Sequence, residues 1–301
     1  MKGLSRFLRT FFVASVAFSA LVACGGGGGG GGSNGFTGVS TLAVIDDTNA
    51  EQLVTDAYAG GSLTDSMVIP LAVGGSQPLD LAPLGNVLFD SVPAFDFAPT
   101  VSKLEAIPPM AGSCGGTASG NINGSETTAS GTIVYDNYCD AGIILNGSVT
   151  FSATLNPSTN AVSMTMHFNS LTTGGGTLSG SVSMSIVNYT DFYSPTTMTM
   201  NIVLTDALGQ TYWIDHYSIA ITPGTGTLDT AVVSGTYHDY DAGHVVITNP
   251  DPLQIDNFTG NPESGTLHFA GANGTYADLV ATGGGGYSLT VSTGTVITGS
   301  F

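Results

Sequence analysis

Apolar and polar residues alternate along most of the chain that follows residue 114. Successive side chains of a β-strand point to opposite faces, so this alternation predicts strands with one apolar and one polar face. The polar positions carry mainly serine and threonine. The apolar positions of the clearest runs are Val149, Phe151, Ala153 and Leu155, then Val162, Met164, Met166 and Phe168, then Leu178, Val182, Met184 and Ile186, and finally Met198, Met200, Ile202 and Leu204.

Turn-forming residues interrupt these runs at short intervals, for example at residues 156–158, 206–209, 241–243 and 273–274. Short connections between strands produce hairpins, and consecutive hairpins produce an antiparallel sheet. We expect about ten to thirteen strands, a number at which a sheet normally curls or closes to protect its edges. The predicted fold is therefore all-β, an antiparallel up-and-down meander that forms a barrel, a half-barrel or a sandwich.

One short helix is predicted before the sheet. Thr48 followed by Glu51 has the spacing of a capping box, and the glycines at 60–61 would end the helix. Its apolar positions recur at helical spacing and are Ala50, Leu53, Val54, Ala57 and Tyr58.

Prolines recur between Pro70 and Pro109 at a density that neither a helix nor a central strand tolerates. We expect this stretch to be extended chain that wraps over the main domain, with one or two edge strands. The predicted organisation has four parts, which are a signal peptide at 1–23, a tether at 24–38, the helix and proline-rich segment at 39–113, and a β domain at 114–301.

The first residues have the order of an export signal. Basic residues fall within 1–9, and the apolar run at 11–22 is too short to span a bilayer as a helix. The sequence Leu21-Val22-Ala23-Cys24 resembles the lipobox of bacterial lipoproteins. That resemblance implies cleavage before Cys24, transfer of a diacylglycerol to its sulfur, and acylation of the new amino terminus. The alternative is an ordinary secretory signal with an incidental cysteine.

A run of glycine from Gly25 to Gly32 follows the cysteine. Glycine-rich chain behaves as a flexible coil, so residues 25–35 are predicted to be a tether with a reach of about 15–20 Å. Several acyl chains on one residue anchor a protein durably, which makes the membrane its expected partner. The residue after Cys24 is glycine rather than aspartate. In the lipoprotein family this implies the outer membrane, on either its periplasmic or its cell-surface face.

A second resemblance begins at Cys114 and is carried by residues 131–139 (GTIVYDNYC) and 145–148 (LNGS). These residues are similar to a segment of uncharacterised, β-rich proteobacterial lipoproteins, which also carry a glycine run after the lipid-bearing cysteine. Residues 264–267 and 273–274 are a weaker likeness. The resemblance supports the envelope location and the β fold, and it implies no activity.

The chain has three cysteines. If Cys24 carries lipid, Cys114 and Cys139 remain, and two cysteines left over in an exported protein usually oxidise together. The predicted disulfide closes a loop of about 25 residues and stabilises the fold by about 3 kcal/mol. A redox pair is the less favoured alternative, because the spacing is not C-x-x-C.

Charged residues make up only 9% of the chain, and the formal net charge is −18. Cleavage before Cys24 removes Lys2, Arg6 and Arg9, and leaves Lys103 as the one basic residue against 22 carboxylates. Such a surface has no cations to replace the counterions of a phosphate backbone, so we exclude nucleic-acid binding. Substrates with phosphate or carboxylate groups also lack their usual arginine partners.

Methionines gather on the predicted apolar face. Thioethers can hold copper(I), or they can line a pocket for an apolar ligand. The same positions also continue the core pattern, and packing by a flexible side chain explains them fully, so core packing is the favoured interpretation. The methionines are Met164, Met166, Met184, Met198 and Met200.

The segment 237–244 (YHDYDAGH) gathers two imidazoles and two carboxylates at a predicted hairpin tip, and Asp215-His216 could lie on a neighbouring strand. His238, Asp241 and His244 are candidate ligands for a transition metal, and a tight turn could bring His244 near Tyr240. Aspartates in turns more often bond the local backbone. The favoured interpretation is therefore a surface loop, with no metal and no other cofactor.

No pattern of nucleophilic catalysis emerges. The G-x-S-x-G match at residues 31–35 lies in the tether, without the strand and helix that a nucleophile elbow needs. The pair Asp239 and Asp241 could serve a glycosidase, but nothing distinguishes these two carboxylates from the others. We therefore predict that the protein is not an enzyme.

The predicted function is that of a lipid-anchored cell-envelope protein, whose β domain is a binding or structural surface module for an unknown partner. One alternative is a carrier that holds an apolar or lipid-like ligand inside a barrel. A second alternative is an integral outer-membrane β-barrel, suggested by strands near ten residues in length and the terminal Phe301.

Overall fold

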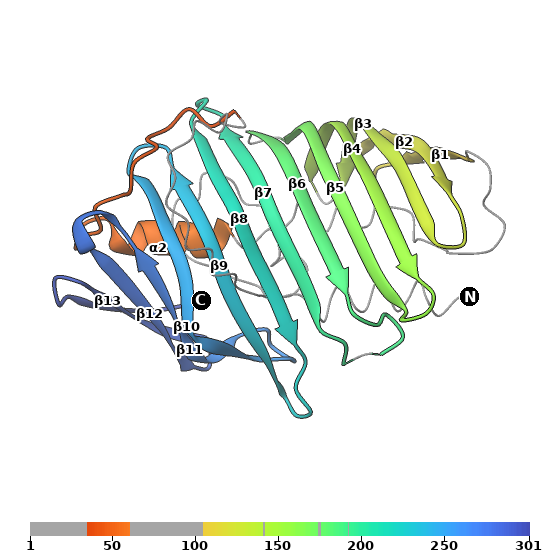
Figure 1. Ribbon diagram of the computed structural model, residues 1–301. Coiled ribbons are helices and arrows are strands. Elements are labelled where there is room, and N and C mark those ends of the chain that lie inside the picture. Colours follow the sequence, from red (N-terminus) through yellow and green to blue (C-terminus); the bar gives the residue numbers. More distant parts are fainter. Residues whose placement is uncertain (1–34, 61–104, 141, 174–175, 192) are drawn as a thin grey trace.

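The computed structural model describes residues 35–60, 105–140, 142–173, 176–191 and 193–301. Its strands form one 14-stranded sheet in which each strand pairs with the next along the chain, and the sheet curves around the helix at Ala50–Gly60 (Figure 1). Neighbouring strands are antiparallel throughout, so the predicted all-β antiparallel meander is confirmed. The elements are α2 (Ala50–Gly60), β1 (Glu105–Ala111), β2 (Gly115–Gly124), β3 (Thr128–Asp140), β4 (Ile143–Asn156), β5 (Ala161–Thr173), β6 (Gly176–Ile186), β7 (Thr196–Asp206), β8 (Thr211–Thr222), β9 (Leu228–Asp239), β10 (Gly243–Asp256), β11 (Pro262–Ala270), the 3₁₀ turn η3 (Ala272–Gly274), β12 (Tyr276–Gly283), β13 (Gly286–Val291) and β14 (Val296–Ser300).

Strands β2–β14 lie in the predicted β domain, and their number, 13, falls within the range that the sequence suggested for it. The first strand, β1, lies in the proline-rich segment, and its register shifts between Ile107 and Met110. Prolines are tolerated on an edge strand and at such irregularities. β1 is thus one of the expected edge strands. The rest of that segment, 61–104, lies outside the described residues, as do the signal peptide, Cys24 and most of the tether.

The predicted alternation of apolar and polar positions is confirmed in β4–β7. Apolar residues such as Phe151 and Met200 are buried, and their sequence neighbours Ser152 and Thr199 are exposed. The registers align the polar positions across four strands, because Ser152 is opposite Thr165, Thr165 is opposite Ser183, and Ser183 is opposite Thr199. One face of the sheet is therefore core, and the other presents rows of small hydroxyl side chains.

The helix α2 lies in the hollow of the curved sheet and packs against β9 and β12 (Figure 1). Each of the five apolar positions that predicted the helix is buried: Ala50, Leu53, Val54, Ala57 and Tyr58. The Tyr58 ring lies 5.2 Å from the ring of Phe301, so the helix also contacts the end of the chain. The apolar face of the sheet is thus the concave one. No helix in the described part of the chain is long and apolar enough to cross a bilayer.

The predicted capping box at the start of α2 is wrong. Thr48 does not cap the helix, because its hydroxyl donates to Asp46 Oδ1 at 2.6 Å. Asp46 also accepts the backbone N–H groups of Thr48 and Asn49, and its carbonyl accepts the N–H of Ala50. An aspartate that bonds the backbone two and three residues ahead forms the turn by itself, which moves the start of the helix to Ala50.

Residues 36–45, which we name the strap, run along the end of the sheet before the chain enters α2. Figure 1 shows this segment in orange above β8–β10. Val39 donates its N–H to the carbonyl of Tyr240 at 2.9 Å, and Ala43 donates to the carbonyl of His244 at 2.8 Å. Gly243 permits this approach, because a Cβ added there would lie 2.3 Å from the carbonyl oxygen of Thr41, and its φ is +98°.

Candidate functional site

The imidazoles singled out in the sequence lie where the strap meets β8–β10. Trp213 of β8 is opposite His238 of β9, and His238 is opposite His244 of β10. Tyr237, the neighbour of His238, belongs to the concave core, so His238 and its cross-strand partners lie on the convex face. The strap pairs with the edge of β10 at a bridge between Leu42 and His244, and its Phe36 ring lies against Trp213 and His238.

His238 is packed among aromatic rings. Its imidazole stacks on the indole of Trp213 with ring centroids 4.4 Å apart and an interplanar angle of 19°. The ring of Phe36 lies 5.4 Å away, and that of His244 lies 4.8 Å away. His238 is only 7% exposed. The expected surface loop is therefore correct for the turn, but His238 itself belongs to a small aromatic cluster beneath the strap.

Asp215 lies on the strand next to His238, as the sequence suggested. It accepts a hydrogen bond from Nδ1 of His216, whose side chain is 84% exposed. Its other oxygen, Oδ2, lies 3.9 Å from Nε2 of His238. Burial acts to raise the pKa of Asp215, but the interactions with His238 and His216 outweigh burial, and the pKa is lowered. Asp215 is thus a charged group between one buried and one exposed imidazole.

His244 is the second imidazole of the cluster. Burial lowers its pKa, and the neighbouring His238 lowers it further. The backbone of the strap at Ser40 and Thr41 acts in the opposite direction without reversing the shift. His244 is therefore held in its neutral form to a lower pH than an exposed histidine.

The third candidate ligand, Asp241, is not part of the aromatic cluster that contains the two imidazoles. It is exposed at the hairpin tip, where the carboxylate of Asp239 accepts the N–H groups of Asp241 and Ala242 at 2.9 and 2.8 Å. Asp239 therefore holds the backbone of the turn, as aspartates in turns usually do. Within the described residues, no three or more histidine, cysteine, aspartate or glutamate side chains are arranged to hold a metal ion.

Two members of the cluster, Phe36 and Trp213, were not foreseen from the sequence. Trp213 occupies a polar position of the alternation, between Tyr212 and Ile214, and its indole N–H donates to Asn201 at 2.8 Å. A large aromatic residue at an outward position was the available signal that something covers this face. Phe36 carried no such signal, because its neighbours are glycine, asparagine and threonine.

The methionine face is part of the core. Met164 is opposite Met184, and Met184 is opposite Met198, while Met166 and Met200 flank Val182 in the next row. All five methionines are at least nine-tenths buried. The flexible side chains fill the concave side next to the cross-strand row that contains Val149, Phe168 and Ile202, which agrees with core packing.

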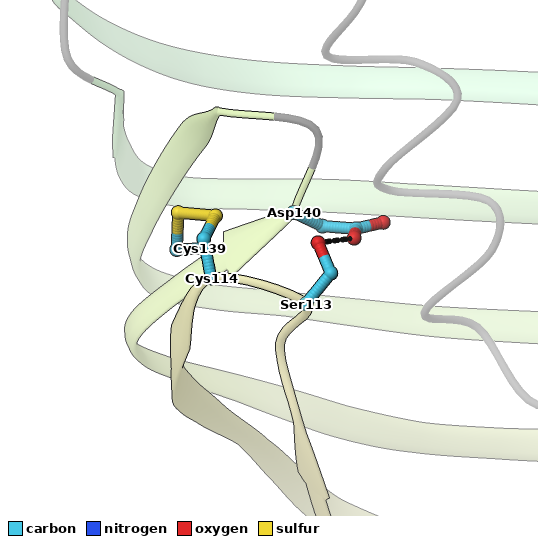
Figure 2. Close-up of a disulfide and its surroundings, with 4 residues drawn as sticks. All are labelled: Ser113, Cys114, Cys139 and Asp140. Carbon is cyan, nitrogen blue, oxygen red and sulfur yellow. Dashed lines mark hydrogen bonds between the residues drawn. A yellow bond between two sulfur atoms is a disulfide. The ribbon is translucent and has the colours of Figure 1, made fainter.

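The predicted disulfide joins Cys114 and Cys139, with Cα atoms 5.1 Å apart (Figure 2). It connects the start of β2 to the end of β3, and the N–H of Cys114 donates to the carbonyl of Cys139 at 3.1 Å. Beside it, Ser113 donates a hydrogen bond to the carboxylate of Asp140. The bridge therefore fastens the ends of three strands near one edge of the sheet.

Comparison with known proteins identified no relative of this chain. No family model matches the chain, and neither a curated protein nor a solved structure matches it. The function must therefore be argued from the sequence and the structure of this chain alone.

Proposed function

We propose that the protein is a lipid-anchored component of the bacterial cell envelope, whose β body is a non-enzymatic binding or structural module. The disulfide carries this proposal. A bridge between Cys114 and Cys139 is typical of an oxidising compartment outside the cytosol. It also accounts for two of the three cysteines, and leaves Cys24, the cysteine of the lipobox-like sequence, as the one available for a lipid.

The direction of the apolar face supports a body that stays outside the bilayer. A protein that crosses a membrane with strands presents its apolar side chains outward to lipid. Here the apolar residues of β4–β7 face the concave side, while serine and threonine rows face outward. A lipid at Cys24 would then be the element that enters the membrane, with the glycine tether between it and the strap.

The convex face suggests how such a body acts. Its serine and threonine rows form a broad, nearly uncharged surface, suited to hydrogen bonding with a hydroxyl-rich or peptide partner. The alternative of an apolar carrier has less support, because the methionine face that would line the ligand site is buried as core.

Mass spectrometry of the native protein tests the anchor directly. We expect a mature chain that begins at Cys24 and carries the mass of a diacylglycerol and an amide-linked acyl group. The variant Cys24→Ala should appear in the soluble fraction after an alkaline wash, whereas the tether control Ser33→Ala should remain in the membrane fraction. An unmodified thiol at position 24, or a Cys24→Ala protein that stays in the membrane, would contradict the proposal.

Organic extraction separates the module from the carrier. We extract the purified, correctly oxidised protein with an organic solvent and quantify the lipids that are not covalently attached. The proposed module should release none at a stoichiometric level. Release of about one lipid per chain would instead support the carrier.

A further inference from the structure

The two outer strands of the sheet, β1 and β14, each have one edge without a partner strand among the described residues. The β1 edge is poorly suited to accept another strand. Pro108 and Pro109 lie within β1, and its register shifts between Ile107 and Met110. Proline lacks the N–H that pairing requires, and natural sheets block their edges with prolines and with such irregularities. By contrast, β14 (Val296–Ser300) has no proline, no charged residue and a continuous register with β13.

The backbone groups of β14 that point away from β13 follow from the bonds at its two ends. Thr295 and Phe301, which flank β14, bond to the backbone at the two ends of β13, at 2.9 and 2.8 Å. Hydrogen-bonded residues alternate along an antiparallel strand, so Ile297 and Gly299 also bond to β13. The N–H and C=O groups of the residues between them therefore point outward from the sheet. These residues are Val296, Thr298 and Ser300.

The concave side of this edge is apolar and only partly covered. A Cβ added at Gly299 would lie 2.5 Å from the ring of Tyr287, so that ring lies over the glycine. The Tyr287 ring lies 5.3 Å from the ring of Phe301, and both Phe301 and Ile297 are half-buried where they pack against the core. We name Ile297, Tyr287 and Phe301 the ledge. A strand added beside β14 would place apolar side chains against the ledge and complete its burial.

Three carboxylates flank the same edge. Asp47 accepts a hydrogen bond from Thr293, in the turn before β14. Glu51 hydrogen-bonds to Tyr287, and Glu263 accepts a backbone N–H of the β12–β13 turn at 3.1 Å. The described part of the chain has no lysine or arginine to balance these charges. A basic strand would therefore be attracted to the edge, whereas a second copy of this chain would bring the same carboxylates against it.

We propose that the outer edge of β14 is a docking site for an extended, basic segment of a partner protein, which adds to the sheet as a further strand. The outward backbone groups supply the pairing, the ledge favours apolar residues at alternate positions, and the carboxylates favour lysine or arginine at the ends of the segment. Because β14 has five residues, the site accepts a segment of about that length. This inference rests on the binding role proposed above, but it does not depend on the lipid anchor.

Hydrogen exchange of the full-length protein, in an uncharged detergent and without a partner, tests whether the edge is free. After correction for intrinsic rates, we expect the amides of Val296, Thr298 and Ser300 to exchange at least about tenfold faster than those of Ile297 and Gly299. Equal protection of the two sets would mean that another segment already pairs with this edge, and it would overturn the proposal.

A synthetic peptide tests the docking and its charge preference on the same protein. The probe is the acetylated peptide KVTVSK, and its matched control EVTVSE reverses only the terminal charges. On addition of KVTVSK, nuclear magnetic resonance should show that the three outward amides become protected. Its affinity should exceed that of EVTVSE about tenfold or more at low salt. No gain in protection would overturn the docking site, and equal affinities would overturn the basic partner.

Thr298→Pro removes one outward N–H and no bond to β13, which a sheet edge tolerates, so it should weaken peptide binding about tenfold or more. The matched control Thr298→Val keeps the N–H and should bind as the wild type does. KVTVSK methylated at alternate backbone nitrogens, in each of the two registers, covers the case in which Thr298→Pro does not fold, and one register should not bind the wild type. Binding that survives all these changes would disprove strand addition. A wild-type dimer that Thr298→Pro abolishes would show instead that a second copy occupies the edge.

Discussion

Strands β4–β7 and strands β8–β10 differ in the number of faces that they bury. In β4–β7 the concave residues are core, and outward residues such as Ser152, Ser185 and Thr199 are exposed. In β8 and β9 the concave residues are also core, but the outward residue His238 is 7% exposed beneath Phe36. The first region has one core and the second has two, a large one around α2 and a small one beneath the strap.

This difference shows what the alternation of apolar and polar residues can and cannot reveal about which face of a sheet is buried. Alternation identifies a face that is buried by the sheet's own curvature and by one helix. It does not identify a face that becomes buried because a segment distant in sequence folds back onto it. The bridge between Leu42 and His244 joins residues from opposite ends of the chain, and nothing local in either segment requires it.

The largest expected effect tests whether the concave core is equally important in both regions. Leu178→Ala in β6 and Leu253→Ala in β10 each truncate a fully buried leucine. We expect each to lower the free energy of unfolding by about 3–5 kcal/mol, through lost burial and the cavity left behind. Denaturant unfolding measures both, with the outward Ser185→Ala as a control that should change the free energy by less than about 0.5 kcal/mol. A loss below about 1 kcal/mol for either leucine would show that its region lacks a packed core.

The disulfide gives the next largest effect, confined to one region. Replacing Cys114 and Cys139 by serine should cost about 3 kcal/mol, because the unfolded chain is no longer cross-linked. Hydrogen exchange should rise first in β1–β3, whose ends the bridge joins, and later in β8–β10. Reduction of the wild type provides the control, since it breaks the bond without changing the sequence. Simultaneous loss of protection in both regions would mean that they open as one unit.

Much of the fold could be predicted because it depends on local pattern. The strands, the helix at Ala50–Gly60 and the pairing of Cys114 with Cys139 follow from alternation, helical spacing and a cysteine count. The capping box failed because Asp46, two residues earlier, accepts both the hydroxyl and the N–H of Thr48 and so forms the turn in its place. The edge strand β1 could be expected only in outline, because it contains two prolines, which a sheet edge tolerates but a local pattern does not specify.

The candidate site was predictable only in part. The closeness of His238, His244 and Asp215 could be inferred from hairpin geometry, since cross-strand neighbours follow from the position of the turn. Their environment could not, because Phe36 arrives from outside the sheet and converts a surface position into a buried one. The chemistry of an imidazole depends on that burial more than on its sequence neighbours.

A smaller effect tests whether the second core stabilises the protein. Trp213→Ala removes the indole that stacks on His238 and contacts Phe36, and we expect a loss of about 2 kcal/mol in the free energy of unfolding. The matched variant Thr199→Ala, at an exposed outward position of the adjacent strand β7, should cost less than about 0.5 kcal/mol. If the two losses were equal, the aromatic cluster would add nothing to the free energy of unfolding. The second core would then not distinguish the stability of β8–β10 from that of β4–β7.

The smallest expected effect is a difference in acid sensitivity between the two regions. Asp215 in β8, beside His238, and Asp256 at the end of β10 have a lowered pKa, the latter because it accepts backbone hydrogen bonds. Asp46, which accepts hydrogen bonds from Thr48 directly after the strap, has a lowered pKa as well. A carboxylate with a lowered pKa stabilises the fold above its unfolded pKa of about 3.9, and that contribution is lost as the pH falls through the folded pKa. Asp229 acts in the opposite sense, because burial raises its pKa. Below about pH 4 we therefore expect hydrogen exchange to rise in β8–β10 before it rises in β4–β7, and Asp215→Asn should reduce the difference. Acid opening that begins in β4–β7 would contradict this prediction, because the shifted carboxylates would then not control the order of opening.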